Sequence, residues 1–132
     1  MTAFATIEEA RTYFTGDLFA MNCGITLDAL SDDTCVCSMP VTPQLQNAAG
    51  GVMGGAIFTL GDFAFAVLAN HLHRTTVAQQ VSINFLSGTR GKRLIAAATC
   101  KKNGKTTCVI NIDITDDLGR DIAQFTATGY KL

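Results

Sequence analysis

Charged residues are scarce in this sequence, and their scarcity limits what the chain can be. They make up 16% of the 132 residues, while 48% of the residues are hydrophobic; average soluble domains have about 25% charged residues. This much apolar surface can offset the entropy lost on folding, so an intrinsically disordered chain is excluded. The length leaves room for one hydrophobic core, and we expect a single domain over residues 1–132.

Features typical of nucleic-acid-binding and secreted proteins are also missing. The net charge is −1, tryptophan is absent, and basic residues do not alternate with aromatic ones, which argues against a nucleic-acid partner. The five cysteines are an odd number without a CxxC pair, and the N-terminus has no basic segment followed by an apolar run. We therefore expect reduced, buried thiols and a cytoplasmic location.

Signatures of metal and nucleotide sites are missing as well. The two histidines, His71 and His73, have no cluster of carboxylates beside them, so we expect no metal and no bound cofactor. Residues 113–118 lack the glycine of an EF-hand. There is no GxGxxG, P-loop or Gly-x-Ser-x-Gly motif, which argues against a dinucleotide-binding fold and a serine hydrolase.

One carboxylate stands alone in a long uncharged stretch. Residues 34–73 carry a single formal charge, that of Asp62. An unpaired buried charge is costly, so Asp62 should be hydrogen-bonded, have a raised pKa, or face a cavity. A purely structural role, such as a bond to Thr59, is one alternative. A membrane span over residues 48–69 is another, but a central Asp opposes insertion by about 2.5 to 3.5 kcal/mol, so we expect no membrane partner.

The N-terminal third has the pattern of a short helix followed by a β-hairpin. Residues 6–9 form a capping box, a hydroxyl residue with Glu three positions later, which predicts a helix from about 7 to 14. Residues 25–29 and 35–41 alternate between apolar and polar on either side of a turn. This alternation predicts two paired antiparallel strands.

The rest of the chain changes from a long apolar run to strand-like segments. The apolar run predicts a buried helix over residues 54–70, because its length suits a helix better than a strand. Four strand-like segments follow, over residues 77–86, 94–101, 106–115 and 121–130. We expect an α+β fold with a short N-terminal helix, in which a curved antiparallel sheet of about six strands wraps the long central helix.

Four glycines surround the start of the predicted central helix, in Gly50-Gly51-Val52-Met53-Gly54-Gly55. Glycine lets a ligand approach the backbone closely, and the unpaired N–H groups of a helix N-terminus can hold a phosphate or an oxyanion. Gly54 and Asp62 are eight residues apart, about 12 Å along one helix. That is too far to act on one carbonyl group, so we hypothesise that two subunits combine, one supplying Gly54 and the other Asp62.

The segment from Asn47 to Asp62 resembles the hotdog-fold thioesterases, and within them the PaaI-like group of phenylacetate degradation. That group carries an Asn, a short loop, His-Gly-Gly, and then an acidic residue on the central helix. The runs Arg90-Gly91-Lys92-Arg93-Leu94 and Asp117-Leu118-Gly119-Arg120 also fit. The resemblance covers nearly the whole chain. It implies homodimers, often paired into tetramers, that hydrolyse acyl-CoA thioesters without a metal.

The resemblance also implies roles for individual residues. Asp62 would activate water as a general base, or act as the nucleophile. The N–H of Gly54, together with that of Gly55, would polarise the thioester carbonyl. Asn47 would position water or substrate, and Gln80 falls where some relatives place a polar group near the carboxylate.

One position departs from the family's pattern. Met53 stands where the family usually has histidine in its substrate-binding loop, and methionine neither donates a hydrogen bond nor carries a proton. This leaves open a non-catalytic protein that binds acyl-CoA or another small ligand. A hotdog hydratase is a further alternative, but it needs an acid–base pair, and neither His71 nor His73 is suitably placed by sequence.

Basic residues gather in the second half of the chain. Seven of the ten lysines and arginines lie between Arg74 and Lys105, and residues 63–112 contain no acidic residue. Coenzyme A enters only as part of the substrate, and its phosphates would bind a basic rim. We expect Arg90 and Arg93 to contact them; the alternative is that both are solvated turn residues. The acyl group cannot be deduced from the sequence.

Overall fold

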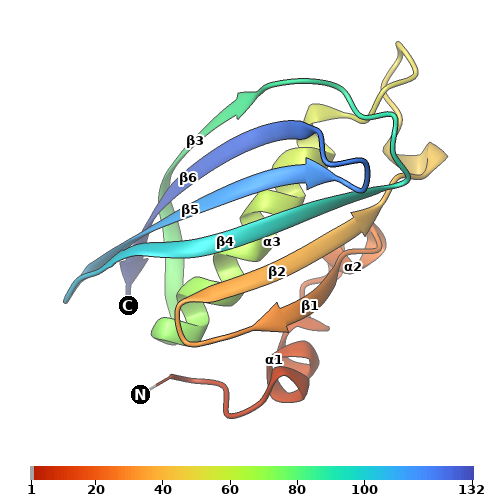
Figure 1. Ribbon diagram of the computed structural model, residues 1–132. Coiled ribbons are helices and arrows are strands. Elements are labelled where there is room, and N and C mark those ends of the chain that lie inside the picture. Colours follow the sequence, from red (N-terminus) through yellow and green to blue (C-terminus); the bar gives the residue numbers. More distant parts are fainter. Residues whose placement is uncertain (1) are drawn as a thin grey trace.

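The computed structural model describes residues 2–132 (Figure 1). The predicted helices and strands are all present, with ends within two residues of the expected ones, and two short elements had not been predicted, α2 and a 3-10 turn. In chain order the elements are α1 (Ile7–Phe14), α2 (Leu18–Asn22), β1 (Thr26–Leu30), β2 (Thr34–Pro40), the 3-10 turn (Pro43–Leu45), α3 (Gly54–Leu72), β3 (Thr76–Phe85), β4 (Arg93–Asn103), β5 (Thr107–Asp116) and β6 (Asp121–Lys131).

The strands form one antiparallel sheet in the order β1-β2-β4-β5-β6-β3. The sheet curves around α3, which lies across its concave face (Figure 1). Alternate residues of the central strands face α3 and are buried, as in the series Cys108, Ile110, Ile112 and Ile114 of β5. The predicted α+β hotdog architecture, a long apolar helix wrapped by a six-stranded sheet, is therefore confirmed.

Close packing fixes α3 on the sheet. A Cβ added at Gly61 would lie 2.6 Å from Cδ2 of Phe125 on β6, so only glycine lets the helix approach this ring. By length and composition α3 could cross a bilayer, but 67% of its apolar window is buried inside the protein. It is the core helix of the fold and not a membrane span.

The capping box of α1 forms as the sequence predicts. The hydroxyl oxygen of Thr6 accepts a hydrogen bond from the N–H of Glu9 at 3.1 Å, and the carboxylate of Glu9 accepts one from the N–H of Ala5 at 3.3 Å. At the other end of α1, the ring of Phe14 packs edge-on against Phe63 of α3, with 5.5 Å between ring centroids. These contacts hold α1 beside the central helix.

The two edges of the sheet differ. At the β1 edge, the guanidinium Nε of Arg11 in α1 donates a hydrogen bond to the carbonyl oxygen of Leu27 at 2.9 Å. At the opposite edge only Thr76 of β3 is buried, and Val77 and Phe85 are 43% and 54% exposed. One edge is therefore covered by a helix, while the other presents apolar side chains to solvent.

Four of the five thiols lie on strands, and Cys23 is at the C-terminal end of α2. Cys35, Cys37 and Cys108 are buried, Cys23 and Cys100 are half-buried, and no disulfide forms among residues 2–132. The alternation of β2 places Cys35 and Cys37 on its inner face, where both thiols are buried.

Candidate active site

Asp62 lies partly buried in the middle of α3 and faces a cavity. The cavity has a volume of about 210 Å³ and is lined by Asp17, Phe19, Ala20, Phe58, Thr59, Asp62 and Phe63. The hydroxyl of Thr59 donates to the carbonyl oxygen of Gly55 at 2.8 Å and not to Asp62, so the structural alternative of an Asp62–Thr59 bond is wrong. The carboxylate of Asp62 has no hydrogen-bond partner within residues 2–132, which leaves it available to a ligand in the cavity.

The surroundings of Asp62 change its acidity. Burial raises the pKa of Asp62 above its ordinary value, and the negative charge of Asp17 raises this pKa further. A carboxylate with a raised pKa is a stronger base in its ionised form, and this property suits a general base that takes a proton from water. Of the three states expected for a lone buried carboxylate, the structure has two, the raised pKa and the cavity.

A tight loop prepares the start of α3. The side-chain oxygen of Asn47 accepts hydrogen bonds from the N–H groups of Ala49 and Gly51, both at 3.0 Å. The backbone N–H of Asn47 donates to the carbonyl oxygen of Gly51 at 2.7 Å. Gly50 has a φ of 90°, a conformation that glycine adopts without strain. The side-chain oxygen of Asn47 therefore shapes the glycine loop.

The first turn of α3 presents free backbone donors. The N–H groups of Ala56 and Ile57 donate to the carbonyl oxygen of Met53, at 2.9 and 3.2 Å. Those of Gly54 and Gly55 precede this turn, and no acceptor for them exists among residues 2–132. Such N–H groups carry the partial positive charge of a helix N-terminus. The side chain of Met53, 54% exposed, lies beside them without a polar atom to add.

One protomer keeps the carboxylate and the backbone donors apart. Gly54 and Asp62 belong to one uninterrupted helix, so eight residues separate them by about 12 Å. A cavity of about 200 Å³ beside the glycine loop is lined by Val41, Thr42, Pro43, Gln46, Gly50, Gly51, Val52 and Thr89. It shares no residue with the cavity of Asp62.

The remaining predicted site residues lie outside the Asp62 cavity. Gln80 is exposed on β3, and its Nε2 donates to the carbonyl oxygen of Val81 at 3.3 Å. Arg90 is exposed in the loop between β3 and β4. The guanidinium of Arg93 is engaged on the outer face of the sheet, where its Nε donates to the hydroxyl of Ser38 at 2.9 Å.

The sequence analysis missed the α2 side of the Asp62 cavity. Phe19 and Ala20 lie in a helix of five residues and Asp17 is its N-cap, and such a helix is too short to show helical periodicity. A weak signal existed, because Asp17 is a residue type favoured at helix N-caps and glycines stand at Gly16 and Gly24 on either side of the segment. The proximity of Asp17 to Asp62 is a tertiary contact that no local pattern reports.

The histidines lie elsewhere. His71 is 4% exposed at the far end of α3, where its ring stacks on Phe4 with 5.8 Å between centroids. Nine residues of helix separate it from Asp62, about 14 Å, so the two do not form the acid–base pair of a hydratase in one protomer. Residues 2–132 contain no group of three or more His, Cys, Asp or Glu side chains that could hold a metal ion.

Comparison with known sequences identifies the family of the chain. The model of the family described as "Thioesterase superfamily" matches residues 49–123. The chain is 30% identical over 126 residues to acyl-coenzyme A thioesterase PaaI of Escherichia coli K12, covering 95% of this chain and 90% of that relative. It is also 30% identical over 104 residues to human acyl-coenzyme A thioesterase 13, covering 76% of this chain and 74% of that relative.

Solved structures give the same result. The E. coli PaaI protein from the phenylacetic acid degradation operon matches with a TM-score of 0.90 and 28% identity, covering 96% of this chain and 92% of that one. A hypothetical thioesterase of Streptococcus pneumoniae TIGR4, solved with coenzyme A, matches with a TM-score of 0.83 and 29% identity, covering 90% and 94%. The chain therefore belongs to the thioesterase superfamily, in its PaaI-like hotdog group, and is a thioester-hydrolysing enzyme.

Proposed function

We propose that the protein hydrolyses acyl-CoA thioesters to a free acid and coenzyme A, at a site shared between the two subunits of a dimer. The observation that carries this proposal is the separation of two complementary half-sites, a carboxylate facing a cavity and free N–H donors at a helix N-terminus. The acyl-CoA thioesterase names of the relatives, and the coenzyme A in one related structure, support the substrate class.

The proposed reaction needs only groups of the chain and water. Asp62 takes a proton from a water molecule, whose oxygen attacks the thioester carbonyl carbon. The carbonyl oxygen becomes an oxyanion that accepts hydrogen bonds from the N–H groups of Gly54 and Gly55 of the partner copy. The carbon–sulfur bond then breaks, the coenzyme A sulfur takes the proton from Asp62, and the free acid leaves. Direct attack by the Asp62 carboxylate, followed by hydrolysis of the resulting anhydride, is the alternative route.

The exposed edge of the sheet supports the second subunit. β3 presents Val77 and Phe85 to solvent, and a second copy would cover these side chains and the unpaired backbone of the strand. The ring of Phe85 lies 3.4 Å from the position of a Cβ on Gly54, so this edge adjoins the start of α3. Two copies paired here with antiparallel α3 helices would bring Gly54 of one toward Asp62 of the other. Two such dimers would form a tetramer.

The surrounding residues have supporting roles in this proposal. Arg90, exposed in the loop between β3 and β4, would bind a phosphate of coenzyme A, with Arg93 adding positive charge from the start of β4. Asn47 would hold the glycine loop in shape and direct its side-chain N–H₂ toward water or substrate. Gln80 would reach the shared site from β3. No metal or further cofactor takes part, and the half-buried and buried free thiols fit a reducing cytoplasm.

A thiol-release assay over aryl, short-chain and long-chain acyl-CoA tests the proposal, with Asp62→Asn as the decisive variant. We expect turnover to fall at least about a hundredfold, because the general base is removed. The matched control Asp113→Asn changes an exposed carboxylate on β5 and should leave turnover unchanged. Near-normal hydrolysis by Asp62→Asn would contradict the role of Asp62. Ligand-induced thermal stabilisation without thiol release by the unmodified protein would instead favour a non-catalytic binder.

The stability of Asp62→Asn gives a second readout. The pKa of Asp62 is higher in the folded protein than in the unfolded chain, so the folded protein binds this proton more tightly. As the pH rises through the range between the two pKa values, Asp62 ionises in the folded protein and the free energy of unfolding falls. Asparagine removes that cost. We therefore expect the variant to be at least as stable as the unmodified protein at pH 7, measured by thermal denaturation, which separates a lost function from a lost fold.

A further inference from the structure

The loop between β3 and β4, residues 86–92, begins beside the free backbone donors of α3. The ring of Phe85, the residue before the loop, lies 3.4 Å from the position of a Cβ on Gly54. Thr89, in the middle of the loop, lines the cavity of about 200 Å³ beside the glycine loop. A substrate bound at the Gly54 donors therefore has this segment, which we call the β3–β4 loop, as a neighbour.

A buried carboxylate on the β5–β6 hairpin holds this loop. Asp116, the last residue of β5, is 2% exposed, and it is the one acidic residue among residues 2–132 that is so deeply buried. It accepts a hydrogen bond from the hydroxyl of Thr89 at 2.7 Å. In the turn before β6 it also accepts bonds from the N–H groups of Leu118 at 3.0 Å and Arg120 at 2.9 Å. The bond from Thr89 lowers the pKa of Asp116 below its ordinary value, so the carboxylate is ionised at neutral pH.

Further hydrogen bonds fix the backbone on both sides of Arg90. The hydroxyl oxygen of Thr89 accepts the N–H of Gly91 at 2.9 Å, and the carboxylate of Asp117 accepts that of Lys92 at 2.9 Å. Gly91 packs so closely on Asp117 that a Cβ at this position would overlap the carboxylate. The β5–β6 hairpin therefore holds the chain immediately before and after Arg90.

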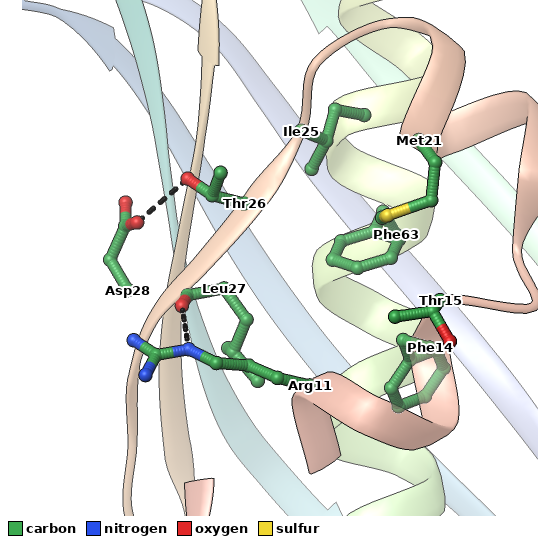
Figure 2. A pocket seen from close by; sticks show the side chains of 9 residues that line it. All are labelled: Arg11, Phe14, Thr15, Met21, Ile25, Thr26, Leu27, Asp28 and Phe63. Atoms are coloured by element: carbon green, nitrogen blue, oxygen red, sulfur yellow. Dashed lines mark hydrogen bonds between the residues drawn. The ribbon is translucent and has the colours of Figure 1, made fainter. Parts of the chain in front are cut away.

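The anchored loop carries two cations whose charged groups are free. The side chains of Arg90 and Lys92 are exposed, and they make no hydrogen bond or ion pair within the part of the chain that the structure describes. Arg93, at the start of β4, is engaged instead, because its Nη2 donates to the hydroxyl of Thr26 at 3.1 Å. Figure 2 shows that Thr26 is in turn bonded to Asp28. Free cations at a fixed place suit the anionic groups of a ligand, and phosphates above all.

We propose that Asp116 is a positioning residue for substrate binding, which fixes the β3–β4 loop through the Thr89 hydroxyl so that Arg90 and Lys92 meet the phosphates of coenzyme A. This assignment rests on the proposed function, because it takes the ligand to be an acyl-CoA. A loop that is already ordered loses little freedom on binding, so it binds the phosphates more tightly than a mobile loop does. Asp116 itself touches no substrate, and it acts on KM rather than on the chemical step.

Removing the Thr89 hydroxyl tests this contact with little change of shape. Thr89→Val should raise the KM for the acyl-CoA that is hydrolysed fastest at least about fivefold, and should leave kcat within about twofold. Thr89→Ser keeps the hydroxyl, so its KM should stay close to that of the unmodified protein. The control Thr99→Val makes the same change at an exposed position of β4 and should alter neither constant.

Asp116→Asn tests the carboxylate itself. The amide places an N–H₂ donor where the carboxylate accepts the Thr89 hydroxyl, so we expect the same rise in KM as in Thr89→Val. Asp113→Asn, at an exposed position of the same strand, is the matched control and should change nothing. If circular dichroism shows that Asp116→Asn is unfolded, Thr89→Val decides the outcome.

A substrate without phosphates shows whether the loop acts through its cations. The acyl-pantetheine thioester with the same acyl group keeps the reacting bond but has none of the phosphates, so Thr89→Val should leave its kcat/KM within about twofold. In an Arg90→Gln/Lys92→Gln background, Thr89→Val should not raise the KM for acyl-CoA further, because the positioned cations are gone. Equal losses for the two thioesters, or a full effect in that background, would overturn the assignment.

Binding of free coenzyme A keeps this test separate from the proposed function. Its dissociation constant, measured by calorimetry, should rise at least about fivefold in Thr89→Val and stay unchanged in Thr99→Val, whether or not thiol is released. An unchanged constant in folded Thr89→Val, or no binding of coenzyme A by the unmodified protein, overturns the positioning role. Absence of thiol release from every acyl-CoA, with the expected binding pattern intact, overturns the proposed function alone.

Discussion

The two half-sites on α3 are built in opposite ways. Asp62 is a side chain in a cavity with aromatic walls, where burial and the nearby charge of Asp17 raise its pKa. Gly54 and Gly55 contribute backbone N–H groups at a helix start that an ordered loop holds, and neither residue has a side chain of its own to block approach. The comparison teaches that the base depends on what surrounds its side chain, whereas the donors depend on backbone geometry and on the absence of side chains.

Removing one donor without disturbing the helix tests the backbone half of this comparison. Gly54 is the first residue of α3, a position where proline is well tolerated, and Met53 before it has φ −58° and ψ 132°, which suits a residue preceding proline. Gly54→Pro should lower kcat about a hundredfold or more, because it removes an oxyanion donor. Gly54→Ala keeps the N–H and should lose far less activity in the same steady-state assay. Equal losses of kcat in Gly54→Pro and Gly54→Ala would show that the added side-chain volume, and not the loss of the N–H donor, lowers activity.

Mixed dimers test whether the two half-sites meet across subunits. In a heterodimer of Asp62→Asn and Gly54→Pro chains, one shared site has both native residues and the other has neither. The isolated heterodimer keeps one intact site of its two, so we expect about half of the unmodified activity per dimer to return, although each variant alone is nearly inactive. The measurement is thiol release after co-refolding and separation of the heterodimer by two different affinity tags. A site within one subunit would give no recovery, because every site would carry a defect.

The pH dependence of kcat/KM tests the other half of this comparison, the effect of its surroundings on Asp62. Asp62 must be ionised to take a proton from water, so kcat/KM falls on the acid side of its pKa. Asp17→Asn removes the negative charge that raises this pKa, so the acid limb should move to lower pH, while burial keeps it above that of an ordinary Asp. Asp17→Glu retains the charge and should leave the limb close to its original position. An unmoved limb in Asp17→Asn would mean that Asp17 does not act on Asp62 in solution.

Much of the fold was predictable because its signals are local. The apolar run of α3 and the alternation of β5 each report burial within one segment, and the capping box marks the start of α1. Helix α2 gives only the weak signal of an N-cap residue and flanking glycines, because five residues make little more than one turn and show no periodicity. Its position depends on packing against α3, which a local pattern does not contain.

The candidate site was predictable at residues whose type differs from that of their neighbours in the sequence. Asp62 stood out as the one charge in forty residues, and the glycines stood out by their crowding at a helix start. Asp17 did not stand out, since it is an ordinary residue for its segment. It matters only because the fold brings the start of α2 against α3, beside the cavity of Asp62.

The contact between Gly61 and Phe125 limits how this enzyme can evolve. The ring of Phe125 occupies the space that a side chain at Gly61 would need, and Asp62 is the next residue along the helix. The depth of the carboxylate in the protein is thus determined jointly by α3 and by a strand at the other end of the chain. Neither position can accept a larger residue alone, so we expect the two to change together during divergence. A mismatched pair would strain the packing and would also misalign Asp62 for catalysis.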